Sequence, residues 1–334
     1  MEKISPVRIG NHLVGPDQPV FIVAEIGINH NGDVEIVKQL IDVAVKAGAN
    51  AVKFQTRTVE TVYSPQELAK PRPDLAERGL KFLHNAIQRG VIPKECLSRL
   101  ERTNFKDART HEQKCMLELT DGEYSEIDHY CNDRGILWFT SCWDETSVER
   151  MEKFDLPCHK IASPCNEDDD LLRAVRRTGR PIILSTGMTD LDGVRATVEI
   201  LGLENLVILH CTSVYPKGTG APEEVLPLVN LRGIQTLQRE FSVPIGFSSH
   251  DTGIMPSFAA VALGACLLEK HVTLERGMYG SDQPLSIEPD DFSRLCRAAR
   301  ELKLAMGDGE IVIYPDEHAV IEKLRRVRRK MVSV

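Results

Sequence analysis

Residues 20–56, VFIVAEIGINHNGDVEIVKQLIDVAVKAGANAVKFQT, contain the strand–helix–strand unit that decides the fold. Two β-branched, apolar runs, Val20–Ile28 and Ala51–Thr56, flank a stretch whose apolar residues recur at spacings of three and four. Asp33 precedes that stretch as a helix N-cap, and Gly48 follows it where a helix end favours positive φ. Because both runs are apolar nearly throughout, the unit predicts parallel strands covered by helices.

The same rhythm continues along the chain and predicts the architecture. Further strand runs, each followed by a helical pattern, are Leu137–Cys142, His159–Ser163, Pro181–Thr186, Leu206–Thr212, Ile245–Ser249 and Leu267–Thr273. Eight β/α units predict a TIM (β/α)8 barrel, which an N-terminal β-hairpin within residues 7–14 precedes. A doubly wound sheet is the alternative, but its GxGxxG turn is missing after the first strand.

Two segments interrupt the rhythm and define the predicted domain organisation. Arg57–Ile136 is a long, charged insertion after strand 2, with helical patches, and we expect it over the barrel mouth. Glu317–Lys330 is basic and helix-prone, typical of a solvated or subunit-packing helix. We therefore expect a barrel over residues 1–308 and a basic helical tail over 309–334.

Composition excludes several classes of protein. The 334 residues are 42% hydrophobic and 27% charged, as in ordinary globular proteins, and the net charge of −8 argues against nucleic-acid or anionic-membrane binding. No apolar run approaches the ~18 residues that span a bilayer, and Met1–Pro6 lacks the apolar core of a signal peptide. The nine cysteines form no CxxC pair, so we expect reduced thiols and a cytoplasmic location.

Active sites of such barrels lie at the carboxyl ends of the strands, so the polar residues there are the candidates. Lys53 and Lys160 are charged residues within apolar strands. They would either form internal ion pairs with Glu25 or Glu269, or bind a phosphate or carboxylate. Together with hydroxyl side chains at the strand ends they suggest an oxyanion site, and those hydroxyls are Ser163, Ser185, Ser213 and Ser248.

His250 and His271 end neighbouring strands, so their imidazoles would converge. Two histidines with oxygen ligands suit a catalytic divalent ion, whereas a lone histidine such as His210 is more often a hydrogen-bonded core residue. Three cysteines near strand ends have no base at a diagnostic spacing, which argues against a cysteine nucleophile; they are Cys142, Cys165 and Cys211.

Five motifs follow one another along the chain: AEIGINHNG at 24–32, VKFQT at 52–56, ILSTGM at 183–188, HCTSVYP at 210–216 and EKHVT at 269–273. Together they resemble the N-acetylneuraminate (sialic acid) synthase family, over residues from about Ile9 to Gly309. The resemblance implies condensation of phosphoenolpyruvate with an N-acetylated aldose, such as N-acetylmannosamine, giving a nonulosonic acid and phosphate. It also implies a homodimer or higher homo-oligomer.

The resemblance also implies roles for the candidate residues. His250 and His271 would hold a divalent ion, with Mn²⁺ expected and Mg²⁺ or Co²⁺ as alternatives. Phosphoenolpyruvate would lie among Lys53, Lys160, Ser163, Ser185, Ser213 and Ser248, although the family more often has Asn at the position of Ser213. Glu25 would activate water at the reacting carbon, and Gln55, Tyr215 and Asp282 would contact the sugar.

Three departures from the family concern the sugar. Cys165 stands where full-length synthases carry a glutamate near the sugar, and the insertion is longer than in the family. We expect no C-terminal antifreeze-like domain, as in a barrel-only branch that shares GSDQ at 280–283. The insertion would then act as a lid over the mouth, and its charged residues, including Lys70, Arg72 and Arg78, would supply a cation on the sugar side.

Two other functions remain open from the sequence. Arg57, beside Gln55, would suit a 3-deoxy-ulosonate phosphate synthase, whose acceptor aldose carries its own phosphate. A barrel that has lost catalysis and serves as a binding subunit is the second alternative. It would have no reason to retain the two histidines, Glu25 and both lysines.

Overall fold

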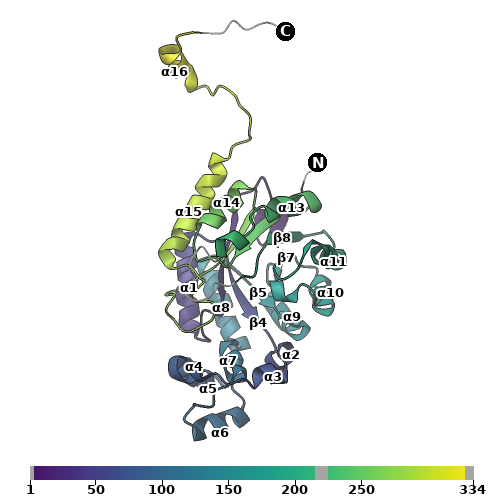
Figure 1. Ribbon diagram of the computed structural model, residues 1–334, viewed down its shortest axis with the longest axis vertical. Helices are drawn as coiled ribbons and strands as arrows, with labels where there is room; N and C mark the ends of the chain where they lie inside the picture. Colours follow the sequence, from purple (N-terminus) through teal and green to yellow (C-terminus); the bar gives the residue numbers. More distant parts are fainter. Residues whose placement is uncertain (1–3, 215–224, 328–334) are drawn as a thin grey trace.

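The computed structural model describes residues 4–214 and 225–327, and within them eight parallel strands close into a barrel (Figure 1). The strand order is β10-β3-β4-β5-β6-β7-β8-β9, which confirms the predicted (β/α)8 architecture. The strands are β3(Phe21–Gly27), β4(Ala51–Thr56), β5(Leu137–Cys142), β6(His159–Ile161), β7(Ile182–Ser185), β8(Leu206–His210), β9(Ile245–Ser249) and β10(Leu267–His271).

Helices surround this barrel, generally one after each strand. They are α1(Val34–Ala47), α8(Asp121–Arg134), α9(Glu145–Met151), α10(Asp169–Arg177), α11(Leu191–Leu201), α13(Gly233–Glu240), α14(Met255–Ala262) and α15(Pro289–Ala305). Short 3-10 turns are η1(Glu152–Phe154), η2(Ser163–Cys165) and η3(Leu226–Leu228).

The first strand–helix–strand unit forms as its sequence predicts. The Asp33 carboxylate caps α1 by accepting from the backbone N–H groups of Glu35 and Ile36. Gly48 ends the helix with φ of 78°, a conformation that costs a residue with a Cβ about 1–2 kcal/mol. These caps fix where α1 starts and stops, and therefore where β4 enters the sheet beside β3.

Several strands end earlier than the apolar runs predict. In the run His159–Ser163 the strand ends at Ile161, and in the run Leu206–Thr212 it ends at His210. The remaining residues leave the sheet at the carboxyl rim, where η2 and the loop after β8 begin. The chain departs from regular pairing at the rim that carries the candidate site.

The N-terminal hairpin of β1(Val7–Ile9) and β2(His12–Val14) packs beneath the barrel interior. Its Val7, Ile9 and Val14 belong to the same buried cluster as Phe21 and Phe139. The hairpin therefore closes the amino end of the barrel with apolar side chains and leaves the carboxyl end for polar ones.

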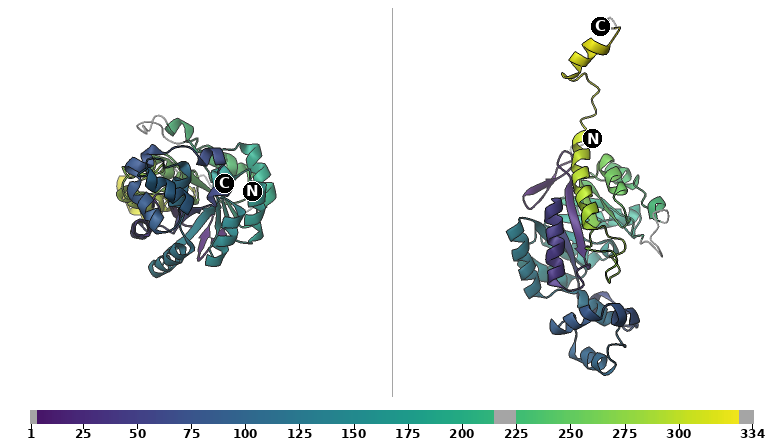
Figure 2. Two further views of the ribbon diagram at one scale, coloured as in Figure 1. Left: turned by 90° about the horizontal axis from the view of Figure 1, so that it is seen from below. Right: turned by 90° about the vertical axis from the view of Figure 1, so that its left-hand side faces the viewer.

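The segment between β4 and β5 is a helical insertion with its own apolar core, at the opposite end of the barrel from the tail (Figure 2). Its helices are α2(Val59–Val62), α3(Pro65–Leu68), α4(Pro73–Arg78), α5(Leu80–Gln88), α6(Lys94–Arg102) and α7(Thr110–Leu117). That core also includes Ile28 and Tyr279, which join it to the barrel loops. One difference from the expected insertion is α8, which packs against α1 and β5 as the regular barrel helix.

The tail beyond α15 extends away from the barrel (Figures 1 and 2). Its helix, α16(Glu317–Leu324), is shorter than the predicted Glu317–Lys330 and has no buried residue; residues 328–330 are outside the described part. Among the described residues, no helix has both the length and the apolar character needed to cross a membrane.

Candidate active site

A pocket opens at the carboxyl ends of the strands, and almost every predicted site residue lines it. Those residues are Glu25, Lys53, Gln55, Lys160, Ser163, Ser185, Ser213, Ser248, His250, His271 and Asp282. Tyr215 lies outside the described residues. The strand-end rule therefore brings together side chains from seven of the strands or the loops that follow them.

Two lysines and two glutamates form a charged cluster at the pocket floor. Lys53 Nζ lies 3.2 Å from Glu25 Oε2 and 3.0 Å from Glu269 Oε1, and Lys160 Nζ lies 3.8 Å from the same Glu269 oxygen. Register explains the convergence, since Glu25 is paired with Lys53 on β4 and with His271 on β10. Both sequence interpretations of the lysines are compatible with this geometry, because ion-paired lysines still line the pocket.

The pKa values of these buried groups shift in different directions. Burial raises the pKa of Glu25 to about 7, although Lys53 opposes the shift. Burial also acts on Glu269, but Lys160 and Lys53 outweigh it and lower the pKa of that carboxyl. Burial lowers the pKa of Lys160 to about 8. Glu25 is thus the carboxyl that exchanges a proton near neutral pH.

Serine hydroxyls surround Lys160 and Glu269. Lys160 Nζ donates to Ser185 Oγ over 2.6 Å, and Ser248 Oγ donates to Glu269 Oε1 over 3.0 Å. Ser163 Oγ accepts from the Gly187 backbone N–H over 3.1 Å. Ser213 Oγ is buried and has no hydrogen-bond partner within the described residues. A buried hydroxyl without a partner beside two lysines is suited to an anionic ligand.

The histidine pair lies beside this cluster, with ring centroids 5.3 Å apart. His271 Nδ1 is buried, has no hydrogen-bond partner in the described chain, and lies 4.0 Å from Asp282 Oδ2. Burial and the neighbouring His250 hold the pKa of His271 well below its usual range, so its ring is neutral. Two imidazoles and a carboxylate are suitable ligands for a divalent ion that keeps open coordination positions. The His271 Nδ1 atom without a partner among the described residues is consistent with such a site.

The insertion adds residues that the strand-end rule did not identify. Tyr63 and Lys114 line the pocket, and the Lys114 ammonium lies 4.9 Å from the Tyr63 ring centre. Both lie on or beside short helices, where the sequence shows only an ordinary polar surface. Trp143, in the loop after β5, also lines the pocket.

Arg57 connects the insertion to the buried carboxylate of Glu25 through Gln55. Its Nη2 donates to Gln55 Oε1 over 2.7 Å, and Gln55 Nε2 donates to Glu25 Oε1 over 3.0 Å. Its Nε lies 3.1 Å from Glu118 Oε1, and its guanidinium lies over Trp143. The arginine is held on several sides and orients Gln55 toward Glu25.

The expected sugar-side cations are not the ones in the pocket. Lys70 pairs with Glu67 and Arg72 with Asp74, and Arg78 is exposed on α4. None of the three lines the pocket, whereas Arg57 and Lys114 do. The pocket cations do come from the insertion, but the three named examples were the wrong ones, because sequence alone does not show which face of each short helix turns to the barrel.

The remaining histidine and cysteines behave largely as buried groups. His210 Nε2 lies 3.0 Å from the Val229 carbonyl oxygen, as the core interpretation predicts. All nine cysteines are free thiols. Cys211 is the one among Cys142, Cys165 and Cys211 that lines the pocket, where its Sγ lies 3.9 Å from His250 Nδ1.

The fold and pocket define a class: a (β/α)8 barrel with buried lysines, serine hydroxyls and a histidine pair at one mouth. The chain belongs to the NeuB family, whose family model matches residues 80–311. This agrees with the resemblance that the five motifs indicate.

Named relatives are synthases of sialic-type acids. The chain is 34% identical to the N-acetylneuraminate-9-phosphate synthase of Homo sapiens over 314 residues, 93% of this chain and 78% of the relative. It is 29% identical to the N,N'-diacetyllegionaminic acid synthase of Legionella pneumophila over 330 residues, 96% of this chain and 83% of the relative.

A solved structure is similar over the whole chain. The N-acetylneuraminic acid synthetase of Leptospira borgpetersenii, in complex with citrate, is 27% identical with a TM-score of 0.76. The match covers 99% of this chain and 100% of that one. A truncated 3-deoxy-D-arabino-heptulosonate 7-phosphate synthase from Thermotoga maritima, at 14% identity and a TM-score of 0.62, shares the fold.

Proposed function

We propose that this protein condenses phosphoenolpyruvate with an N-acetylated aldose of the N-acetylmannosamine type, giving a nonulosonic acid and inorganic phosphate. The observation that carries the proposal is the joint burial of Lys53 and Lys160 beside the histidine pair in one pocket. A site for an anion and a site for a carbonyl acceptor are then adjacent, as a carbon–carbon condensation requires.

Lys53, Lys160 and the serine hydroxyls bind phosphoenolpyruvate in this account. Both lysines are nearly inaccessible to water, and in such surroundings a charge-assisted hydrogen bond is strong. Ser213 Oγ would gain the partner that it lacks among the described residues. The anion also offsets the positive charge near Glu269.

Glu25 acts on water after the new bond forms. C3 of phosphoenolpyruvate attacks the aldehyde carbon, C2 becomes cationic, and water adds to C2 while Glu25 accepts its proton. The tetrahedral carbon then expels phosphate by breaking its C–O bond. A pKa of about 7 suits the exchange of a proton in both directions, and Gln55 fixes the carboxylate.

His250 and His271, with Asp282 beside them, would hold a divalent ion, whose chemistry there is Lewis-acid polarisation of the acceptor carbonyl. We propose Mn²⁺, with Mg²⁺ or Co²⁺ as alternatives, because the pocket side of the pair offers oxygen ligands. Gln55, Asp282 and Lys114 lie where acceptor hydroxyl groups would enter the pocket.

A phosphorylated acceptor is the second candidate. Arg57 and Lys114 are cations on the insertion side of the pocket, and the printed name of the human relative specifies a 9-phosphate product. Arg57 is already paired with Glu118, which leaves Lys114 as the main candidate for a second phosphate. The pairing of Arg57 with Glu118 therefore favours an unphosphorylated acceptor.

The test is phosphate release from phosphoenolpyruvate and Mn²⁺ with a panel of aldoses, each offered free and as its 6-phosphate. The proposal predicts that phosphate is released only with an N-acetylated aldose that carries no phosphate. The product should have the mass of the aldose plus pyruvate. Preference for a 6-phosphate by 10-fold or more would favour the second candidate. A barrel without catalytic function would release no phosphate with any acceptor.

A further inference from the structure

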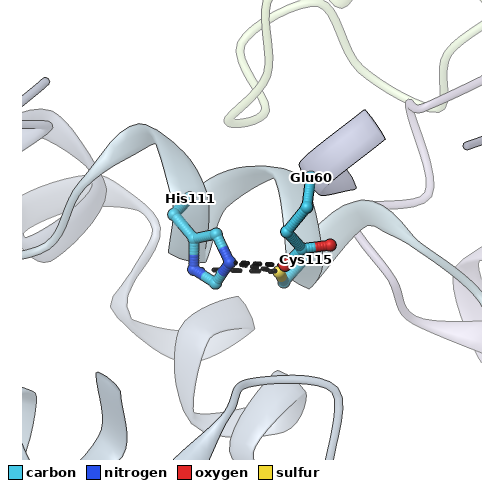
Figure 3. A group of neighbouring side chains, drawn as sticks. All are labelled: Glu60, His111 and Cys115. Atoms are coloured by element: carbon cyan, nitrogen blue, oxygen red, sulfur yellow. Dashed lines mark hydrogen bonds and ion pairs between the residues drawn. The ribbon is translucent and has the colours of Figure 1, made fainter. Parts of the chain in front are cut away.

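The insertion holds a second group of metal-type ligands, away from the floor of the barrel pocket (Figure 3). His111 and Cys115 lie four residues apart on α7, so they share one face of that helix. Glu60 reaches the same place from α2, which packs against α7. Their ligand atoms all lie within 4.8 Å of one another.

Distances within the group approach those of a coordinated ion. His111 Nε2 lies 2.9 Å from Glu60 Oε1 and 3.7 Å from Cys115 Sγ. Ligands 2.0–2.3 Å from a tetrahedral zinc ion are separated by about 3.3–3.7 Å. The sulfur and nitrogen already have that spacing, and the carboxylate oxygen lies within 4.8 Å of both.

The other side of the imidazole is arranged to orient it. His111 Nδ1 lies 3.6 Å from Cys96 Sγ and 3.9 Å from Glu112 Oε1. Glu112 itself is occupied by Arg99 and by the backbone N–H of Arg109. A histidine that binds a metal through one nitrogen commonly directs its other N–H to such a carboxylate. The same ring also belongs to a second candidate group, with Cys96 and Glu112 on its Nδ1 side. Because Arg99 already pairs with Glu112, Nε2, facing Glu60 and Cys115, is the nitrogen left for an ion.

We propose that Glu60, His111 and Cys115 bind one divalent transition ion of the zinc type, at a site separate from the histidine pair of the barrel. The thiolate, imidazole and carboxylate ligands select zinc over the harder Mn²⁺ or Mg²⁺. Three protein ligands leave the fourth position to water. Binding releases the Cys115 thiol proton to solvent and forms the sulfur–metal bond.

Such an ion would join α2 to α7 at the mouth of the barrel pocket. Tyr63 follows α2 and Lys114 lies between His111 and Cys115 on α7, and both line that pocket. The site thus holds Tyr63 and Lys114, which both line the pocket, in a fixed relation to each other. Its role is structural at the pocket mouth and does not depend on the reaction that the barrel performs.

The experiment is titration of metal-free protein with Co²⁺, which reports thiolate ligation through a near-ultraviolet charge-transfer band. We expect the band to appear and to saturate within two equivalents of Co²⁺, since the histidine pair of the barrel also takes one ion, and excess Zn²⁺ to remove it. Cys115→Ser and His111→Ala should abolish the band, whereas Cys96→Ser should retain it. Cys211→Ser should also retain it, which excludes a signal from the thiol beside His250.

Two further measurements test whether the variants fold and whether Glu60 is a ligand. Each variant should keep the circular dichroism spectrum of the parent, and Glu60→Gln should weaken Co²⁺ binding by about 10-fold or more while retaining the band. A band that persists in Cys115→Ser would overturn the proposal. So would its absence in the parent protein, which would leave Glu60, His111 and Cys115 as a hydrogen-bonded group only.

Discussion

Lys160 is a buried lysine in the pocket, beside Glu269. Burial lowers its pKa to about 8, so the ammonium form dominates below pH 8 and is lost above it. We therefore predict that kcat/KM for phosphoenolpyruvate falls as pH rises through about 8. Lys160→Met should remove this dependence and raise the KM about 10- to 100-fold, the value of a charge-assisted contact. Steady-state kinetics from pH 6 to 10 check this, and an unchanged alkaline limb in Lys160→Met would contradict it.

Glu25 is the residue to which the account gives the proton of the attacking water. Its pKa of about 7 means that the carboxylate form grows as pH rises through 7, and kcat should rise with it. Glu25→Gln keeps the shape and the neighbour Gln55 but cannot accept a proton. We predict that kcat falls by about 100-fold or more and that the acid limb disappears. If Glu25→Gln keeps the parent kcat and the acid limb of the pH profile, another group accepts the proton.

The sequence predicts some residues of the pocket and not others. Lys53 and Lys160 were predictable as site candidates because a charged side chain inside an otherwise apolar strand requires an ion partner or a bound anion. Lys114 gave no such signal, since a lysine on a polar helix is ordinary. Its place in the pocket depends on how α7 packs, which is a tertiary property.

Among elements, the loop after β7 brings its backbone close to the hydroxyl groups of the site. A Cβ at Gly187 would collide with the hydroxyls of Ser213 and Ser163, and would approach Ser163 Cβ to 3.0 Å. Gly187→Ala should therefore turn both hydroxyls away and raise the KM for phosphoenolpyruvate about 10-fold, the value of one or two hydrogen bonds. Gly122→Ala, with open space around it, is the control. Equal KM values in the two variants would exclude a role for these hydroxyls.

Helix α7 of the insertion should affect the acceptor rather than phosphoenolpyruvate. Lys114 lies in the pocket beside Tyr63, away from the Lys53–Glu269 cluster. We predict that Lys114→Met raises the acceptor KM about 10-fold and leaves the phosphoenolpyruvate KM within about 2-fold. Lys94→Met, at an exposed position on α6, is the matched control. An effect on phosphoenolpyruvate alone would contradict this division of the pocket.

Elements with clear end signals were also the predictable ones. Asp33 and Gly48 delimit α1 in sequence and in structure. The sequence of α8 also carries a capping box, Thr120 with Glu123, but it buries few apolar residues, namely Tyr124, Ile127 and Cys131. That weak apolar face explains why residues 121–134 resemble the polar insertion although they form a barrel helix.

At the scale of the whole molecule, closure of the barrel brings residues from the first and last strands into one site. The pairing of β10 with β3 places His271 beside Glu25, 246 positions away in the chain, within one layer of the pocket. Alternating apolar runs and helices predicted that closure, whereas the way the insertion covers the mouth depends on its own core. The acceptor side was accordingly the part that sequence described least well.

The most direct test of the central claim is the fate of the bridging oxygen of phosphoenolpyruvate. The protein is supplied with Mn²⁺, an N-acetylated aldose and phosphoenolpyruvate carrying ¹⁸O between C2 and phosphorus, and both products are analysed by mass spectrometry. The account predicts that the ¹⁸O appears in inorganic phosphate and that the unlabelled nonulosonic acid forms only when the aldose is present. Retention of the ¹⁸O in the organic product, or release of phosphate without any aldose, would contradict it.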